Sequence, residues 1–291
     1  MRSEARPVPW GEGATLAECL ATATRQLAEA LALPPREARL EAQILFAHAL
    51  GVNRAWLIGH DRDVPPAAPA IEALLLRRLA GEPVAYLLGE REFYGRTFRV
   101  TPDVLIPRPD TELLVDVALE HLPPRTRHTL LDVGVGSGVV AVSLALERPL
   151  CRICGVDLSA AALEVARANA RALQAQVELL VGDGLDSLSG RRFDLIVSNP
   201  PYIAAADPHL GQGDLRFEPH LALAAGGDGL DLIRRLVEAA PGHLETGGWL
   251  LLEHGWDQAG AVRDLLHGGG FSGVFSARDL AGHERVSGGH R

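Results

Sequence analysis

Four residues near the middle of the chain, Asn199, Pro200, Pro201 and Tyr202, suit the binding of a planar amine or amide. They follow an apolar run at 193–198 that reads as a strand. The two prolines stiffen the loop and lack N–H groups, so the Asn199 side-chain oxygen and the Pro200 carbonyl can both accept from one –NH₂ group. The Tyr202 ring can lie against the plane of that group. Asn199 and Pro200 are therefore candidate catalytic residues for chemistry at a nitrogen, and the alternative is a plain Asn-Pro turn.

A glycine loop in LLDVGVGSGVVAVSLA is the second candidate site. Gly134, Gly136 and Gly138 allow a tight turn and a close ligand approach, with Val135 and Ser137 between them. The loop joins a predicted strand to a predicted helix, where ligands of open parallel sheets bind. From Gly136 onward it also matches a dinucleotide fingerprint, so the loop alone does not identify its ligand.

Two aspartates follow the next two predicted strands. Asp157 can accept hydrogen bonds from a ribose, or it can cap the helix that starts near Ala160. Asp183, followed by Gly184, can receive the amino group of an adenine, or it is only the turn residue of an Asp-Gly step. These loops contain no Arg or Lys for a pyrophosphate, and an acidic pocket tolerates a sulfonium cation. The set therefore favours S-adenosylmethionine, with Asn199 facing it from the fourth strand.

The elements that must position these residues alternate after position 112. We expect strands at 129–133, 152–156, 177–181, 193–198 and 249–253, and helices at 139–147, 160–173, 230–240 and 258–267. Nearly continuous apolar strands are typical of a parallel sheet with helices on both faces, so we predict an α/β domain over 111–291. We expect the tail VSGGHR to be frayed.

The part of the chain before this domain is predicted to be helical. Leu16, Leu20, Leu27 and Leu31 form an amphipathic stripe, and further helices are expected at 36–50 and 69–80. Residues 1–83 contain 9 Arg against 10 Asp plus Glu, so this bundle has no basic face and suits protein docking. We expect residues 84–110 to be a hairpin around Gly95 and a linker.

Composition limits the cellular setting and the partners. The 291 residues carry a net charge of −9, all 28 basic residues are Arg, and clustered cations for nucleic acid are not evident. The start, MRSEARPVPWGEG, has no apolar segment behind its charges, and no apolar run is long enough to span a membrane. Three cysteines do not make a disulfide framework. We therefore predict a cytoplasmic protein with no membrane contact and no direct nucleic-acid binding.

Two cysteines and three histidines are further candidates for a functional role. Cys151 and Cys154 spell C-x-x-C, but in a strand this spacing puts their side chains on opposite faces, as in ordinary core cysteines. His209, His220 and His254 lack metal-ligand spacing, so we predict surface or loop residues and no metal site.

Six longer blocks of sequence point to one family of methyltransferases. Through these blocks the chain resembles the HemK/PrmC-type family of peptide chain release factor glutamine N5-methyltransferases, from about Leu16 to LAGHERV near the C-terminus. NPPY alone is shared with adenine methyltransferases of DNA and RNA. The blocks that carry the resemblance are GEPVAYLLGEREFYG, VLIPRPDTELLV, LDVGVGSGVVAVSLA, IVSNPPYI, RFEPHLAL and GDGLDLIRRL.

The resemblance implies a Rossmann-like class I methyltransferase fold with a small N-terminal helical domain that docks the substrate. It implies S-adenosylmethionine as cofactor, S-adenosylhomocysteine as product, and release factors as partners. The methyl group would go to the N5 amide of the glutamine in their Gly-Gly-Gln motif. The family pattern puts the cofactor on Gly134–Gly138, Asp157 and Asn199, and the substrate glutamine on Asn199, Pro200, Pro201 and Tyr202.

Some positions depart from the family or stay open. Val135 replaces a common threonine, and Gly184 stands where relatives often have a bulky residue beside the adenine. Arg108 and Glu112 either shape the entrance of the site or pair with each other. The alternative function is adenine N6 methylation of DNA or RNA. Two other classes are a non-catalytic module that binds S-adenosylmethionine and a nicotinamide oxidoreductase.

Overall fold

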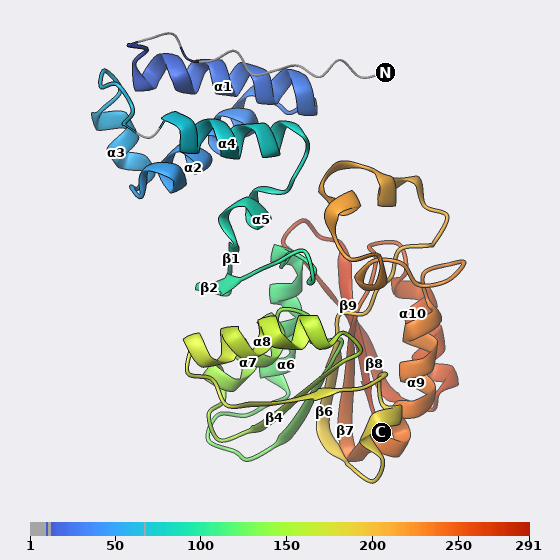
Figure 1. The fold of residues 1–291 in the computed structure, drawn as a ribbon. Coiled ribbons are helices and arrows are strands. Elements are labelled where there is room, and N and C mark those ends of the chain that lie inside the picture. The colour runs from blue at the N-terminus through green and yellow to red at the C-terminus, as the bar shows by residue number, and fades with distance from the viewer. Residues whose placement is uncertain (1–9, 11–12, 67) are drawn as a thin grey trace. The chain divides into compact units, whose positions relative to one another are not determined.

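A computed structural model describes residues 10, 13–66 and 68–291 of the chain (Figure 1). The chain divides into two compact units, one up to Gly89 and one from Glu90 to Arg291. The opening segment MRSEARPVP, where the sequence predicts no targeting signal, lies outside the described residues. In the described part, no helix combines the length and the apolar character that crossing a bilayer requires.

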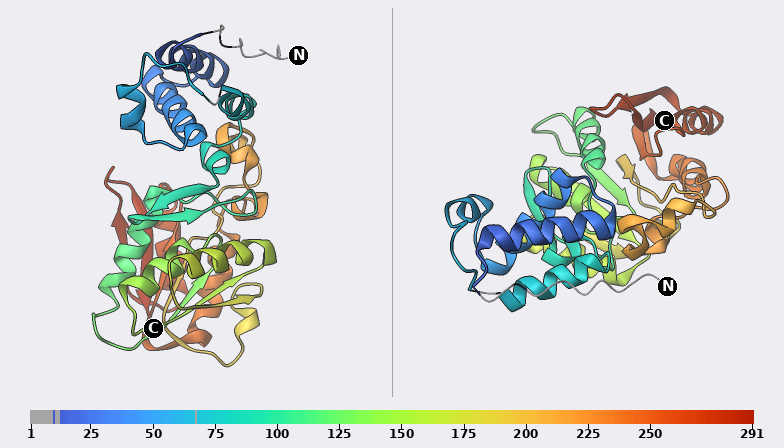
Figure 2. Two further views of the ribbon diagram at one scale, coloured as in Figure 1. Left: turned by 60° about the vertical axis from the view of Figure 1, so that its left-hand side comes forward. Right: turned by 90° about the horizontal axis from the view of Figure 1, so that it is seen from above.

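The first unit is a helical bundle. Its helices are α1 (Leu16–Leu31), α2 (Pro35–Leu50), α3 (Arg54–Gly59), α4 (Ala68–Leu79) and α5 (Val84–Leu88). Figure 2 shows this bundle from two further sides. The predicted stripe is confirmed, because Leu16 and Leu27 are buried in the core that α1, α2 and α4 share, and Leu20 and Leu31 pack against it. Gly51 ends α2 in the left-handed conformation, as expected of a C-cap glycine. The short helices α3 and α5 were not predicted, because each is too short to show a period.

The second unit begins with the predicted hairpin and continues into a seven-stranded sheet. The hairpin pairs β1 (Glu90–Phe93) with β2 (Arg96–Arg99). The sheet order is β5-β4-β3-β6-β7-β9-β8, so β6 lies beside β3 as expected. Strands β3 to β7 run parallel, and β9 is antiparallel to both neighbours. The strand bounds are β3 Thr129–Val133, β4 Arg152–Asp157, β5 Val177–Val181, β6 Phe193–Ser198, β7 Leu244–Glu253, β8 Ser272–Arg278 and β9 Glu284–His290.

Helices cover both faces of this sheet (Figure 1). Side chains of α6 (Glu112–Glu120), α7 (Val139–Glu147) and α8 (Ala160–Ala172) form one core with alternate strand residues. Those of α9 (Asp231–His243) and α10 (Ala259–Gly268) form the other. Neighbours in a strand therefore enter different cores, as Leu130 and Leu131 do. The same alternation confirms the prediction for the cysteines, since Cys151 packs against the first core and Cys154 lies in the second.

The C-terminal tail is not frayed, so this prediction is wrong. Val286 and Ser287 are fully buried, and β9 pairs with β7 on one side and β8 on the other. Chain ends are often poorly ordered, but here the glycines of the tail are required by packing. A Cβ on Gly288 would lie 2.4 Å from Leu251 Cδ2 and 2.8 Å from the Leu250 carbonyl oxygen. A side chain there does not fit between the strand and its neighbours.

Candidate active site

A cavity of about 400 Å³ opens in the second unit at the carboxyl edge of the parallel strands. This volume is in the range of about 300–1,000 Å³ typical of small-molecule sites. Most of the predicted site residues line the cavity: Gly134, Val135, Gly136, Ser137, Asp157, Asp183, Gly184, Asn199 and Pro201. The predicted residues Gly138, Pro200 and Tyr202 are not among its lining residues. The fold thus gathers loops from β3, β4, β5 and β6 around one space.

The glycine loop depends on backbone conformations that favour glycine. Gly134, Gly136 and Gly138 have φ values of 76°, 53° and 87°, in the left-handed region. The loop is tied to the next strand, because Gly134 N donates to the Val156 carbonyl at 2.8 Å. Gly138 begins α7, and a Cβ there would lie 3.2 Å from the Ala166 Cβ on α8. Gly138 therefore allows close helix packing behind the loop instead of facing the cavity.

Asp157 holds the glycine loop and the start of α8 together. Its Oδ2 accepts from Gly136 N at 2.8 Å, and its Oδ1 accepts from Ser159 N at 2.8 Å. The N-cap of α8 is Ser159, whose hydroxyl accepts from Ala162 N at 3.1 Å. The helix cap is therefore not the role of Asp157. Each carboxylate oxygen keeps a further lone pair for a hydroxyl group in the cavity.

Asp132 is a cavity residue that sequence reasoning missed. It lies on β3 before the glycine loop, is buried, and accepts from Ala141 N of α7 at 3.1 Å. Burial, together with the nearby charge of Asp157, raises the pKa of Asp132 to about 7. The signal was the Asp of LLDVG, an ionisable residue inside an otherwise apolar strand. The pocket thus has a second carboxyl group that is neutral or negative around neutral pH.

The predicted acceptor for adenine has an ion-pair partner. Asp183 lies 3.1 Å from the Arg235 guanidinium of α9, which also lies 3.3 Å from Asp186. Arg235 lines the cavity, although no arginine was expected near these loops. Its charge is balanced by the two aspartates, so it is a poor pyrophosphate site. A Cβ on Gly184 would have no atom within 4 Å, so the cavity is open at this position.

Arg108 and Glu112 do not pair with each other. Arg108 lines the cavity and forms an ion pair with Glu218, whose other oxygen accepts from Ile106 N at 3.0 Å. Glu112 accepts from Tyr94 N at 2.8 Å. The buried Glu218 thus joins the IPRP segment to the RFEP segment, which lies in the chain between β6 and α9. Arg108 shapes the wall of the cavity, and Glu112 anchors the hairpin.

Asn199 is oriented by a residue from a distant part of the chain. Its Nδ2 donates to Thr111 Oγ1 at 3.1 Å, and both residues line the cavity. Thr111 ends the short 3₁₀ helix Pro109–Thr111 in front of α6. With its –NH₂ bound to Thr111, the Asn199 amide keeps its oxygen available to accept from a ligand. Thr111 was not predicted, because only tertiary structure brings it to Asn199.

The rest of the NPPY loop is held firmly. Pro200 is buried, and the Tyr202 carbonyl accepts from Gln258 Nε2 at 3.1 Å. Gly229 passes so close that a Cβ there would lie 2.2 Å from this carbonyl oxygen. Burial and the charge of Glu253 raise the pKa of Tyr202, so its phenol stays protonated at physiological pH.

Glu253 and His254, at the end of β7, were not predicted as buried groups. Glu253 is 1% exposed, and burial raises its pKa to about 7, against the effect of a hydrogen bond from Thr111. His254 lies in the loop that follows β7, as predicted, but it is fully buried, whereas His209 and His220 are exposed. His254 Nε2 lies 2.7 Å from Ser287 Oγ, and Nδ1 lies 2.9 Å from the Gly255 carbonyl oxygen.

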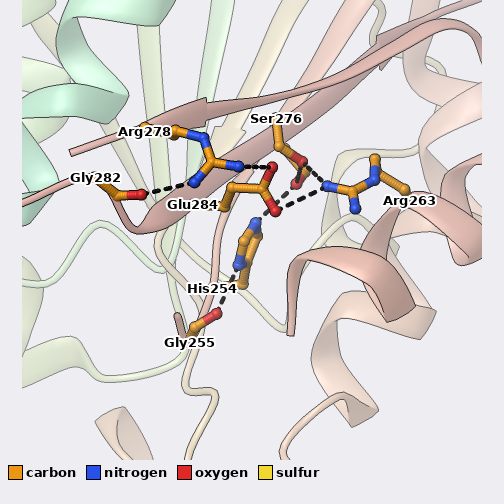
Figure 3. A network of polar contacts seen from close by, with 8 residues as sticks. His254, Gly255, Arg263, Ser276, Arg278, Gly282 and Glu284 are labelled. Carbon is orange, nitrogen blue, oxygen red and sulfur yellow. Dashed lines mark hydrogen bonds and ion pairs between the residues drawn. The ribbon is translucent and has the colours of Figure 1, made fainter. Parts of the chain in front are cut away.

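Figure 3 shows how this histidine joins a network across β7, β8, β9 and α10. Ser287 Oγ lies 2.7 Å from Ser276 Oγ, which accepts from Arg263 at 2.6 Å. Arg263 and Arg278 both pair with Glu284. The network fixes the carboxyl end of β7. The described residues contain no group of three His, Cys, Asp or Glu suited to hold a metal ion.

Comparisons with known proteins agree with this architecture. Residues 18–89 match the family model of the PrmC N-terminal domain, and residues 111–212 match that of the methyltransferase small domain. The chain is 56% identical to a release factor glutamine methyltransferase of Bordetella pertussis, over 87% of this chain and 94% of the relative. It is 50% identical to that of Pseudomonas aeruginosa, over 86% of this chain and 91% of the relative.

Solved structures share the fold. A methyltransferase from Pyrococcus furiosus aligns with a TM-score of 0.52 at 19% identity, over 74% of this chain and 95% of that chain. The 16S rRNA N2 G1207 methyltransferase of T. thermophilus, solved with AdoMet and guanosine, aligns with a TM-score of 0.52 at 21% identity. The alignment covers 69% of this chain and 49% of that chain. The predicted class I methyltransferase fold is thereby confirmed, with the difference that β9 makes the sheet mixed.

Proposed function

Because this chain belongs to the release factor glutamine methyltransferase family, we propose that it methylates the N5 amide of the glutamine in the Gly-Gly-Gln motif of class 1 release factors. It is an S-adenosylmethionine-dependent methyltransferase. One observation carries the proposal for the site. Asn199 lines the same cavity as the glycine loop and Asp157, and Thr111 binds its –NH₂ end. The amide oxygen can therefore accept from a substrate –NH₂ group.

The residues of the cavity suit the cofactor. The backbone of Gly134–Ser137 lines the cavity without bulky side chains at the two glycines, and Asp157 offers lone pairs to a ribose. Asp132 and Asp157 make this wall acidic, which suits a sulfonium cation. The bound cofactor supplies an electrophilic methyl group and leaves as S-adenosylhomocysteine, while the substrate nitrogen loses one proton. We assign Asp183 and Gly184 to the adenine end of the cavity.

The chain's own contribution to the reaction is positioning. The lone pair of an amide nitrogen is delocalised into the carbonyl, so the nitrogen is a weak nucleophile. In our proposal the Asn199 oxygen and the Pro200 carbonyl accept from the two N–H bonds, and Tyr202 supports the amide plane. Fixing a reactant in this way can lower a barrier by about 7–11 kcal/mol in well-oriented systems. The nitrogen becomes acidic only as its new bond forms, so the loop requires no strong base.

The helical unit before Gly89 has a separate proposed role. We assign residues 1–83 to docking of the release factor, residues 84–110 to the connection, and residues 111–291 to catalysis. The match to the PrmC N-terminal domain and the balanced charge of the bundle support this assignment. Because release factors act in translation, we place the enzyme in the cytoplasm, with no membrane partner and no direct nucleic-acid contact.

A single labelling experiment tests the function. The protein is incubated with methyl-labelled S-adenosylmethionine, a class 1 release factor and duplex DNA, and the labelled product is identified by mass spectrometry. We expect the label on the glutamine of the Gly-Gly-Gln tryptic peptide. A release factor with this glutamine changed to alanine is the matched control. Label on adenine and none on the peptide would select the alternative function.

A further inference from the structure

Glu253 is a buried carboxyl group next to the site but outside it. It ends β7, is 1% exposed, and is not among the residues that line the cavity. Its Oε2 has no hydrogen-bond partner within the described part of the chain. An unsatisfied oxygen in this setting destabilises the fold. Glu253 is therefore a poor packing residue, and its interaction with Thr111 offers another reason for its position.

That group is Thr111, which stands between Glu253 and Asn199. A threonine hydroxyl has one hydrogen to donate and lone pairs that accept. Thr111 Oγ1 accepts from Asn199 Nδ2 at 3.1 Å, and a side-chain hydrogen bond from Thr111 favours the ionised form of Glu253. Asn199 thus donates to Thr111, whose one hydroxyl hydrogen is left to donate to Glu253, so the three side chains make a directional series.

The direction of this series decides which end of the Asn199 amide meets the substrate. While Glu253 takes the Thr111 hydrogen, the hydroxyl oxygen can bind only the –NH₂ end of Asn199. If that hydrogen is released, it can turn to Asn199 Oδ1. The amide can then rotate by half a turn and present a donor to the substrate –NH₂ group, which also donates. Two donors do not bind each other.

We propose that Glu253 is a positioning residue that acts through Thr111 to keep the Asn199 oxygen directed at the substrate nitrogen. The identity of the substrate rests on the proposed function, whereas the orientation of Asn199 rests on the contacts above. The network around His254 supports this role, because it fixes the backbone at the end of β7 that carries Glu253 (Figure 3).

The proposal makes the orientation depend on pH. Burial raises the pKa of Glu253 to about 7, so its accepting, ionised form is lost as the pH falls through this value. The charged and titratable groups around it come from several elements: Asp110 and Arg108 beside the 3₁₀ helix, Arg285 of β9, and Tyr202. Arg285 is engaged with Asp110 at 3.2 Å and Asp279 at 3.0 Å. Arg108 is paired with Glu218. The charges of both arginines lower the pKa of Glu253, but the effect of burial is larger.

The first test compares Glu253→Leu with the wild type in release factor methylation and in calorimetric titration with S-adenosylmethionine. We expect kcat to fall by about 10–100-fold, as for a reacting group displaced by about 1 Å, with cofactor affinity unchanged within twofold. Glu245→Leu, the same change at an exposed glutamate near the start of β7 and outside the cavity, is the matched control and should keep the wild-type kcat. A folded Glu253→Leu variant with wild-type kcat would overturn the proposal.

Thr111 provides a second test that does not depend on the stability of Glu253 variants. Thr111→Ser keeps the hydroxyl and should retain kcat within about threefold, whereas Thr111→Val should resemble Glu253→Leu. Equal losses in the two Thr111 variants would show that the hydroxyl is not used. A third readout is the pH profile, in which the wild-type kcat should fall below about pH 7 and the Glu253→Gln variant should lack this acid limb. Persistence of the limb in Glu253→Gln would assign it to another group.

These tests fail separately from the proposed function. If the wild type labels adenine instead of the Gly-Gly-Gln peptide, the function is wrong, and the variants can still be compared on the adenine substrate. If the wild type labels the peptide but Glu253→Leu is fully active, the function stands and the positioning role falls.

Discussion

The cavity has two halves that are built in different ways. The cofactor half, formed by Gly134–Gly138 and Asp157, is local, and its carboxylate contacts the loop across 21 residues of sequence. The proposed substrate half, formed by Asn199 and Thr111 with Glu253 outside the cavity behind them, depends on side chains from separate elements, and Thr111 lies 88 residues from Asn199. The first half is backbone held by one carboxylate, and the second is a series of side chains. A change in the cofactor half should therefore weaken cofactor binding, and a change in the substrate half should lower turnover.

The largest effect is expected for Asn199→Ala, in the substrate half. Removal of one preorganised polar group from an active site lowers kcat by about 10²–10³-fold. Cofactor binding should stay within about threefold of the wild type, because the glycine loop and Asp157 are unchanged. Steady-state methylation of a release factor, with calorimetry for S-adenosylmethionine, measures both quantities. If Asn199→Ala kept turnover but lost cofactor affinity, Asn199 would belong to the cofactor half and not to the substrate half.

Asp157→Ala should give the opposite pattern, in the cofactor half. The loss of charge-assisted hydrogen bonds costs about 1.5–3 kcal/mol, so the Kd for S-adenosylmethionine should rise by about 10–150-fold. At saturating cofactor, kcat should change little. Asp157→Asn is the control, because it can keep one hydrogen bond to the glycine loop. Its Kd for S-adenosylmethionine should lie between those of the wild type and Asp157→Ala. If Asp157→Ala bound S-adenosylmethionine as tightly as the wild type, Asp157 would not be the residue that binds the ribose.

The strand that supports the substrate half should be sensitive to a single methyl group. Gly288→Ala places a Cβ within 2.4 Å of Leu251 Cδ2, so overpacking should lower the free energy of unfolding by about 1–3 kcal/mol. Gly242→Ala is the matched control, since a Cβ there meets nothing within 4 Å and the position is helical. That control should gain about 0.5–1 kcal/mol. Urea unfolding of the three proteins decides whether the tail is part of the core.

The smallest expected effect concerns pH and His254. Burial lowers the pKa of His254 from its ordinary value of 6.5, so the folded state holds the ring neutral. The unfolded chain binds a proton below about pH 6.5, so this histidine lowers the free energy of unfolding as the pH falls. We expect His254→Gln to be less stable than the wild type by about 1–2 kcal/mol at pH 8, with a smaller difference at pH 5. Urea unfolding at both values measures this. If the difference in the free energy of unfolding between the two proteins were larger at pH 5 than at pH 8, the His254 ring would not be neutral in the folded state.

Local patterns explain which predictions held. Strands β3, β5 and β6 and helix α7 have the predicted bounds, because apolar runs and the glycines between them are visible in any short window. The prediction of a frayed tail failed because it rested on the usual disorder of chain ends, whereas Gly288 is required by the contact of β9 with β7. The burial of His254 was not predicted, since its partner Ser287 lies on β9, far along the chain.

The sequence by itself determined the fold class, the glycine loop, Asp157 and the NPPY loop, because each is encoded within a few neighbouring residues. Only the tertiary structure decided that Thr111 and Glu253 stand behind Asn199, that Arg235 is paired with Asp183, and that Arg108 belongs to Glu218. The physical reason is that the orientation of an amide and the charge of a buried carboxyl group depend on atoms within a few ångströms. In this chain, those atoms come from residues far apart in sequence.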